Sequence, residues 1–581
     1  MPLLRAVLPD VDPVVHATLP LRERIRIAAT FWADNGFGTP RYVHLVYILK
    51  VTVWYSLGGL LIISATSDLG GLGNIDQWWK EPVVYQKAVA WTVLMEVVGF
   101  GGAWGPLCAH FKPFTGGARY WLRPGTIRVA PWRWVPGTAG DSRTLVDIAL
   151  YAALLVSLAT AVVWQGDRVP AALAAGAAVL LVVNGLRDSI VFLAARGEQY
   201  LPALVFTAIL DGADLVIAAK VLIVTVWIGA GFSKFGLHFA NVIPPMVSNA
   251  PFVPGTFARR LHYKDAPDDL RPSKLSWGLA HFGGTCVEIL TPLVLLFSTN
   301  ETVTLLAVGV MVSFHLFITM TFPLAVPLEW NVLFAFLAVF LFWGHHASDG
   351  YALSDFSEPW LLALIAAALL TCPVIGNLRP DKVSFLPSMR QYAGNWASAV
   401  WAFSPGAEEK MSRLDLPAPP MTDQLMALLK YDRPTAEQCM SLIAGWRSLH
   451  SQGRGLFSVL IDRYDDIDQR TVREGEFMSN WVRGWNFGDG HLHDERMIAA
   501  IQARVGFEPG ELIVVFVESQ PVHKRVQEYR VIDAALGVIE RGTWRVADAV
   551  AQQPWLPDGP IPLEVTWRAE AASGVTSEVT T

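Results

Sequence analysis

The stretch VLIVTVWIGAGFSKFGLH, residues 221–238, decides the fold, because it is an apolar segment that ends in a lysine. On a helix with about 100° per residue, Lys220 shares one face with three residues of this stretch. Those three are Trp227, Gly231 and Lys234. At about 1.5 Å rise per residue the two lysines lie roughly 21 Å apart, which puts Lys220 deep in a membrane and Lys234 near one surface. They therefore cannot share one small site.

Two lysines on one face of a membrane helix make that face a candidate functional surface. A charge at the bilayer centre costs at least about 2.5 to 3.5 kcal/mol, so intramembrane lysines usually face a bundle interior or a wet cavity. The structural alternative is that Lys220 pairs with a buried carboxylate for packing, while Lys234 extends its amine to the membrane interface.

The composition indicates an integral membrane protein. Of the 581 residues, 52% are hydrophobic and only 17% charged, and the mean hydropathy of +0.37 is too high for an ordinary soluble chain of this length. The net charge of -6 gives no reason to expect nucleic acid as a partner. The four cysteines are scattered and predict neither a disulfide framework nor a metal site. They are Cys108, Cys286, Cys372 and Cys439.

We predict an all-α polytopic membrane bundle of about nine spans, followed by a soluble α+β domain. The apolar segments are about 43–65, 88–109, 145–164, 171–194, 214–234, 277–297, 302–322, 331–343 and 359–374. One stretch, 200–211, is too short to span alone and too apolar for a plain loop. It could be re-entrant, or it could extend the lysine helix.

The N-terminal segment, residues 1–42, lacks the apolar core of a signal peptide and carries several arginines. We expect it to be cytoplasmic, in a multi-pass protein of the cell membrane. The loop 110–137 is also basic and interleaves Arg119, Arg123 and Arg128 with aromatic residues. It is interpreted as a cytoplasmic loop lying on headgroups, with a specific anionic-lipid or phosphate site at these arginines as the alternative.

The charge pattern leaves the side of the C-terminal domain open. The loop 236–276 and the segment after the last span, with Arg379, Lys382 and Arg390, are both basic. Four spans separate them, so they lie on the same side. With nine spans that side would be outside, whereas the excess of basic residues places both inside and requires an even number of spans.

The spanning domain is expected over 43–376, a linker over 377–420 that includes the PAPP of 417–420, and a soluble α+β domain over 421–581. Within that domain 435–450 has helical periodicity, and 512–518 and 563–567 are typical of strands. The cluster GDGHLHDE, 488–495, could offer metal ligands through Asp489, His491, His493 and Asp494. Its spacing matches no specific site, and a turn with Asp494 as the N-cap of the next helix is favoured.

Other polar residues lie at membrane depth. His281 and Glu288 are seven positions apart on one helix face, Glu96 lies in the second span and His315 in the seventh. The lysines need carboxylates from other helices, and Glu288 and Glu96 are the obvious candidates. A buried lysine with a lowered pKa can act as a general base. Each of these groups by itself is more often a structural hydrogen-bonding residue.

Three segments carry a family resemblance. They are WIGAGFSKFGLHF, HFGGTCVEILTPLVLLF and FHLFITMTFPLAVPLEWNVLFAFLAVFLF, which follow one another between residues 227 and 342. In order and spacing they resemble the HTTM superfamily, the membrane domain shared with vitamin K-dependent gamma-carboxylase. The matching residues are Ala230, Gly231, Lys234, Glu288, Pro292 and His315. The sequence departs from the pattern at Ser233, Leu237 and Phe239, and its C-terminal domain does not look like that of the carboxylase. As a whole it looks closest to bacterial multipass proteins of unknown function.

The resemblance implies that Lys234 occupies the position of the base that the carboxylase uses in quinol epoxidation, with Glu288 and His315 beside it. It also implies a quinone or other lipid as the ligand. Candidate substrate-binding residues are Lys220, Trp227, Gly231, His281 and Glu96.

Two function classes follow. One is a membrane enzyme, a carboxylase-like lyase or lipid-modifying enzyme, whose soluble domain recruits a second substrate. The other is a lipid-binding or assembly scaffold whose soluble domain binds a protein partner. Membrane lipids are partners in both classes.

Overall fold

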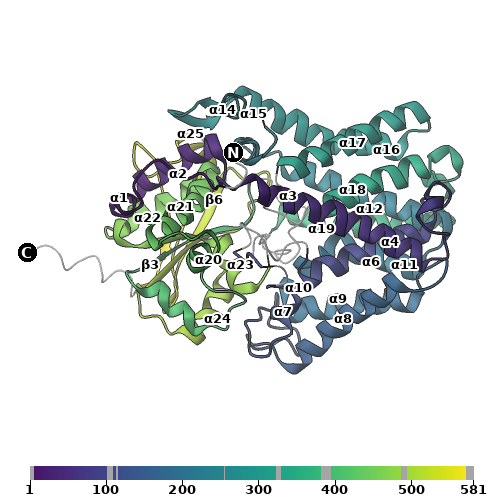
Figure 1. The fold of residues 1–581 in the computed structure, drawn as a ribbon, viewed down its shortest axis with the longest axis horizontal. Coiled ribbons are helices and arrows are strands. Elements are labelled where there is room, and N and C mark those ends of the chain that lie inside the picture. Colours follow the sequence, from purple (N-terminus) through teal and green to yellow (C-terminus); the bar gives the residue numbers. More distant parts are fainter. Residues whose placement is uncertain are drawn as a thin grey trace, which may run out of the picture.

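The computed structural model describes residues 5–100, 109–112, 115–253, 255–321, 329–380, 394–485 and 494–570. A helical bundle lies beside a region built around one β-sheet (Figure 1). The helices of the bundle run roughly along the line that joins these two parts. The membrane class expected from composition agrees with this architecture.

The bundle consists of long helices, several of which contain a π-helical segment. The first runs through α3 (Arg41–Leu49), η1 (Lys50–Leu57) and α4 (Gly58–Thr66), and a later one through α15 (Lys274–Gly278), η5 (Leu279–Cys286) and α16 (Val287–Phe297). The other long elements are α6 (Pro82–Val98), α8 (Leu145–Val163), α9 (Ala171–Arg187), α11 (Gly197–Ile209), α12 (Gly212–Ser233), α17 (Glu301–Thr321), α18 with η6 (Glu329–Ala338, Val339–Gly344) and α19 (Pro359–Leu378).

The nine expected spans are not confirmed. Within the described residues six helices are long and apolar enough to cross a membrane, or seven if the bent pair at 329–344 and 347–355 counts as one span. Two expected spans, α6 and α9, have only 17 residues each. A bilayer core of about 30 Å needs about 20 helical residues. The stretch 200–211 does not extend the lysine helix, because it lies largely in the separate helix α11.

The lysine helix α12 is the centre of the bundle. About 78% of its most apolar window is buried inside the protein, against 28–33% for the other five helices that are long and apolar enough to span a membrane. A helix that is apolar on all sides is typical of a core position. The apolar sequence of α12 therefore explains its central position in the bundle. Both of its lysines are consequently surrounded by other helices and do not face lipid.

The sheet has six antiparallel strands in the order β4-β3-β5-β6-β7-β8. They are β3 (Ser398–Phe403), β4 (Thr471–Glu474), β5 (Leu512–Val517), β6 (Val526–Asp533), β7 (Gly537–Arg545) and β8 (Glu564–Arg568). The predicted strands at 512–518 and 563–567 correspond to β5 and β8. Strand β3 lies within 377–420, the stretch interpreted as a linker, yet it pairs with both β4 and β5 and is buried along its whole length.

Helices cover both faces of this sheet. One apolar cluster joins the sheet to α20 (Met421–Leu429), α21 (Arg433–Leu449), α23 (Gly475–Arg483) and α24 (Glu495–Val505). A second cluster joins it to α22 (Ser451–Arg463) and α25 (Val546–Ala551). The predicted helix at 435–450 is α21, and Asp494 caps α24 by accepting a hydrogen bond from the backbone N–H of Arg496 at 3.0 Å.

The N-terminal segment belongs to the sheet domain. Its helix α2 (Leu21–Asn35) packs along α21, and the backbone N–H of Leu21 donates to Asp468 at 2.7 Å. The fit is close, because a Cβ on Gly445 of α21 would lie 2.6 Å from the Cβ of Ala28. The two ends of the chain therefore lie at the same end of the bundle.

We call this end of the bundle the domain end, and the opposite end the far end. At the domain end three connections of the bundle touch the sheet domain: Trp121 donates to the carbonyl of Arg483, the ring of His238 contacts Ser451, and Leu270 donates to Gln553. At the far end the connections contact one another. Lys87 donates to the carbonyl of Trp164, and Arg168 pairs with Asp211 at 2.7 Å.

A buried arginine holds the sheet domain together. Arg447 of α21 is fully buried and pairs with Glu474 at 2.6 Å and Glu476 at 2.7 Å. Its guanidinium group also stacks on Trp396 and Trp446. Two buried carboxylates are tolerated here because one planar cation binds both.

We expect Arg447→Met to destabilise the sheet domain by about 3–5 kcal/mol, because two carboxylates would stay buried without their cation. Thermal unfolding of the purified protein in detergent measures this. The matched control is Arg433→Met, which removes an exposed pair with Asp423 and should change stability by less than about 1 kcal/mol. Equal melting temperatures of the two variants would contradict the role given to Arg447.

Candidate functional site

The lysine helix brings one of its two lysines to a carboxylate. Lys234 is the C-terminal cap of α12, and its Nζ forms an ion pair with Glu288 of α16. Both side chains are almost fully buried, and the rings of Phe239 and Phe314 lie 5.2 and 5.7 Å from the amine. The expectation that Glu288 supplies a carboxylate to one of the lysines agrees with this contact.

Gly231 makes this pair possible. A Cβ at this position would lie 2.7 Å from Cγ1 of Ile289 and 3.2 Å from the Cβ of Glu288. Only a glycine allows α12 to approach α16 this closely, as small residues do in membrane helix pairs. Gly231 is therefore a packing residue that holds Glu288 against Lys234, and a substrate-binding role is not needed to explain it.

The pair lies on the wall of a cavity of about 340 Å³, which we call the lysine cavity. Its walls come from α12, η5, α16, α17 and α18, and η4 (Phe239–Asn241) and α13 (Ile243–Asn249) cover it at the domain end. Lys234, Glu288 and His315 all line it, and Trp227 does too. Most of the remaining wall is apolar. The structure thus brings the three residues proposed as catalytic to one cavity.

His315 is held by two hydrogen bonds. Its Nε2 accepts from the indole N–H of Trp227 at 2.9 Å, and its Nδ1 lies 3.0 Å from Oδ1 of Asn331. A neutral imidazole carries one proton, and the indole can only donate, so the proton is on Nδ1. Both nitrogens are engaged, so His315 links the wall residue Trp227 to Asn331 and does not offer a free base.

The other expected substrate-binding residues lie away from this cavity. The amine of Lys220 donates to the carbonyl of Tyr351 at 2.7 Å, near the far end. His281 lies against the ring of Trp277, with centroids 5.3 Å apart. Neither residue lines the cavity. The sequence suggested that Lys220 pairs with a buried carboxylate. In the structure its amine instead binds the backbone carbonyl of Tyr351.

Glu96 belongs to a second buried cluster. It is fully buried, and its carboxylate oxygens have no hydrogen-bond partner within the described part of the chain. Nearby, Lys50 pairs with Glu329 at 2.8 Å, with both side chains buried. Neither Lys50 nor Glu329 is among the candidate residues predicted from the sequence. Lys50 could have been found as the one charged residue inside the apolar run 43–65.

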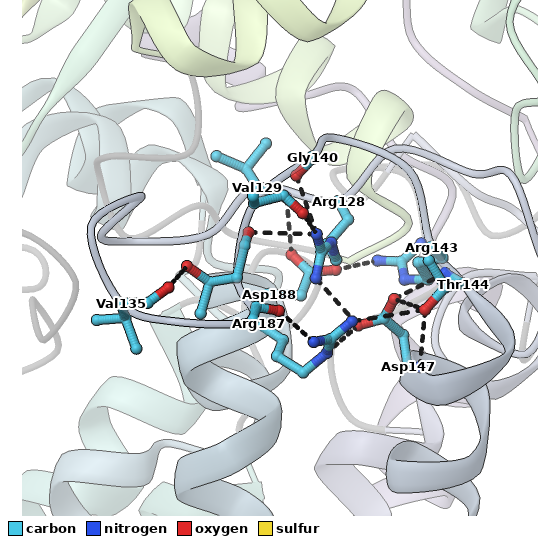
Figure 2. Close-up of polar contacts among 12 residues, drawn as sticks. Arg128, Val129, Val135, Gly140, Arg143, Thr144, Asp147, Arg187 and Asp188 are labelled. Carbon is cyan, nitrogen blue, oxygen red and sulfur yellow. Dashed lines mark hydrogen bonds and ion pairs between the residues drawn. The ribbon is translucent and has the colours of Figure 1, made fainter.

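The three arginines proposed for lipid headgroups do not form one site. Arg128 is buried: it lies 3.2 Å from Asp147 and donates to the carbonyls of Thr138, Ala139 and Gly140 (Figure 2). Arg119 and Arg123 are on the surface, and Arg123 lies 3.5 Å from Asp415 of the sheet domain.

This loop is a junction between the bundle and the sheet domain. Asp188 accepts from Arg143 of the loop at 2.5 Å and from Arg483 of α23 at 2.6 Å (Figure 2 shows the first pair). Arg187 donates to Asp147 at 2.6 Å. The arginines of 119–143 thus serve partly to fix the sheet domain on the bundle. Of the three arginines proposed to bind lipid headgroups, only Arg119 and Arg123 are placed where they could reach a headgroup.

The described residues contain no group of three or more histidine, cysteine, aspartate or glutamate side chains placed to hold a metal ion. Of the expected metal candidates, Asp489, His491 and His493 lie outside the described residues, as does Cys108. Asp494 is occupied as a helix cap and as the partner of Arg496.

A bundle of apolar helices around an ion-paired cavity, fused to an α+β sheet domain, defines a polytopic integral membrane protein. The chain belongs to the DUF3556 family of transmembrane proteins of unknown function, whose model matches residues 1–566. No curated protein and no solved structure matches it. Membership of this family does not connect the chain with the HTTM superfamily or with gamma-carboxylase.

We expect Gly231→Leu to separate α12 from α16 and to break the pair of Lys234 and Glu288, because no space exists for its side chain. The purified variant should be markedly less stable to heat. Gly278→Leu on α15 is the matched control, since a Cβ at Gly278 meets no atom within 4 Å. A Gly231→Leu protein as stable as the control would contradict the close helix contact.

Proposed function

We propose that the protein binds a membrane lipid with a small neutral head in the lysine cavity, where Lys234 and Glu288 recognise the head. The observation that carries this proposal is a buried ion pair on the wall of a mostly apolar cavity of about 340 Å³. Small-molecule sites typically combine apolar walls with a few convergent polar groups.

The charge balance of the site favours a neutral head. Lys234 and Glu288 already neutralise each other, and a charged head would leave one unpaired charge in a low-dielectric site. A hydroxyl or carbonyl can instead accept from the ammonium group, and a hydroxyl can donate to the carboxylate.

Two further wall residues carry unused polar atoms. Within the described chain, Oε1 of Gln199 and the indole N–H of Trp330 are buried without a hydrogen-bond partner. An unsatisfied buried polar atom costs about 1–3 kcal/mol. A ligand that supplied one donor and one acceptor would relieve this cost, which again favours a hydroxyl-bearing head such as an alcohol or a quinol.

An enzyme that acts on this lipid is the second candidate. The amine of Lys234 is bound to the carboxylate of Glu288, so it is not free to act as a simple general base. The contact permits another route: Lys234 passes one proton to Glu288, which leaves a neutral amine and a neutral carboxylic acid in the pair. The resemblance to the HTTM superfamily favours this lysine as the base for a quinone-like substrate.

The scaffold alternative rests on the sheet domain. Strand β8 is the edge of the sheet and is exposed along its length, including Val565 and Trp567. An exposed edge strand offers unpaired backbone groups to a partner strand. We propose this edge as the surface where a protein partner of the sheet domain would bind.

For the membrane topology we propose ten crossings. The contacts at the two ends alternate along the chain, so that each of ten segments runs between the domain end and the far end. These segments are 41–66, 82–98, 145–163, 171–187, 189–209, 212–233, 274–297, 301–321, 329–344 and 359–378. The shortest segments, of 16 or 17 residues, cross if the bilayer thins locally, at a modest cost. An even number leaves both chain ends on one side.

The distribution of basic residues favours the cytoplasm for this side. The connections assigned to the far end, 67–81, 164–170, 298–300 and 345–358, contain only Lys80 and Arg168 as basic residues. The basic loops 110–137 and 236–276 lie at the domain end. Basic residues are enriched in cytoplasmic loops, so we propose that the N-terminus and the sheet domain face the cytoplasm of a cell membrane.

Single cysteines in a cysteine-free background test this topology. With an impermeant thiol reagent on intact cells, we expect Gly73→Cys and Thr299→Cys to be labelled. Lys264→Cys and Arg541→Cys should react only after the membrane is permeabilised. Labelling of Lys264→Cys in intact cells would reverse the proposed orientation, and labelling of only one far-end position would contradict the ten crossings.

Removal of the whole ion pair tests the lipid proposal. The double variant Lys234→Met/Glu288→Leu should fold, because it removes both buried charges, but it should lose co-purified lipid by tenfold or more. Lipid mass spectrometry of the purified protein measures this. Lys220→Met, whose amine lies outside the cavity, is the control. Full lipid occupancy in the double variant would overturn the proposal.

The enzymatic candidate makes a separate prediction. Lys234→Arg keeps the charge but cannot give up its proton near neutral pH, so turnover of a lipid substrate should be abolished while membrane insertion is retained. An activity that survives Lys234→Arg would leave lipid binding without catalysis as the better interpretation.

A further inference from the structure

Four residues line the lysine cavity and are also exposed on the outer surface of the bundle. Three are apolar: Leu279 of η5 and Val310 and Phe317 of α17, with exposed fractions of 36%, 43% and 43%. The fourth is Ser313 of α17. Residues that face both a cavity and the outside mark its mouth. The surface around them is apolar, with Phe282 and Leu316 exposed by 76% and 51%. The mouth therefore opens towards lipid and not towards water.

The wall on the η5 side is built without side chains at two positions. Gly283 and Gly284 both line the cavity and lie in the π-helical segment that precedes Glu288. π-Helical turns are rare and often lie at functional sites. A Cβ on Gly284 would lie 2.7 Å from Cε1 of Phe239, so this side is packed. A Cβ on Gly283 would meet only Leu279, at 3.8 Å, so the space beside Gly283 is open.

The route from the domain end is closed by protein. Phe239, Val242, Ile243 and Met246 line the cavity there, and all are buried. Beyond them, His238 is in hydrogen-bonding contact with Ser451 at 2.8 Å and with Gln520 at 2.6 Å. A molecule arriving from water on that side would have to separate the sheet domain from the bundle.

We infer that the ligand enters the cavity sideways from the bilayer, through a portal between η5 and α17 at Gly283. This inference rests on the lipid-binding function proposed above. The helix that carries the portal begins at Lys274, at the domain end, and Leu279 follows about five residues later. The portal therefore opens into the membrane leaflet nearer the domain end. Its mostly apolar rim passes a lipid with a neutral head and excludes a charged headgroup, because the hydroxyl of Ser313 alone does not replace the water around a charge.

The test uses the full-length protein in phosphatidylcholine vesicles with a diazirine-bearing long-chain alcohol as the probe. Irradiation after increasing times and peptide mapping give the rate at which the probe reaches α12, α16 and α17. We expect Gly283→Trp to lower the initial rate at least tenfold. Gly309→Trp on the lipid-facing side of α17 should label at the wild-type rate, because a Cβ there meets no atom within 4 Å.

A second variant keeps the test independent of folding. Gly283→Cys in a cysteine-free background can be purified and then closed with a bulky maleimide, with the unmodified variant as its own control. Labelling at the wild-type rate after closure would overturn the portal alone. A wild-type protein in which the probe never labels the cavity would overturn both the portal and the proposed function.

Discussion

The buried ion pair between Lys234 and Glu288 is the constraint on which the rest of the structure depends. Two charges inside a membrane bundle are costly unless they meet at close range. Their meeting requires α12 and α16 to approach at Gly231, where a side chain would collide with Ile289. It also requires α12 to end at Lys234, at the domain end of the bundle. The neighbouring helices then leave a cavity beside the pair.

The segment that follows α12, residues 234–238, connects the cavity with the sheet domain. Four residues after Lys234, His238 contacts Ser451 and Gln520 of that domain. On another side of the bundle, Arg483 reaches Asp188, and Trp32 of the N-terminal helix α2 donates to the carbonyl of Pro245 at 3.0 Å. These polar contacts are buried, so they fix one arrangement of the two parts. The sheet domain thus covers the domain end of the bundle.

The neutrality of the pair narrows the chemistry of the cavity. A lone lysine would select anions, and a lone glutamate would select cations. Together they offer one strong donor and one strong acceptor at nearly the same point. His315, fixed between Trp227 and Asn331, adds shape and not charge. Binding of a neutral head follows from this arrangement more directly than catalysis does, since catalysis needs a proton to move within the pair.

Local pattern in the sequence determined the membrane class, the shared face of Lys220, Trp227, Gly231 and Lys234, the strand at 512–517 and the cap at Asp494, because each depends on neighbours a few positions away. Only the tertiary structure decided the rest. It placed β3 inside the sheet, buried Arg128 instead of presenting it to lipid, paired Lys50 with Glu329, and gave Lys220 a carbonyl partner. In each case the partner is distant in sequence or is a backbone group, and no periodicity within one segment encodes which helix or strand will lie beside it.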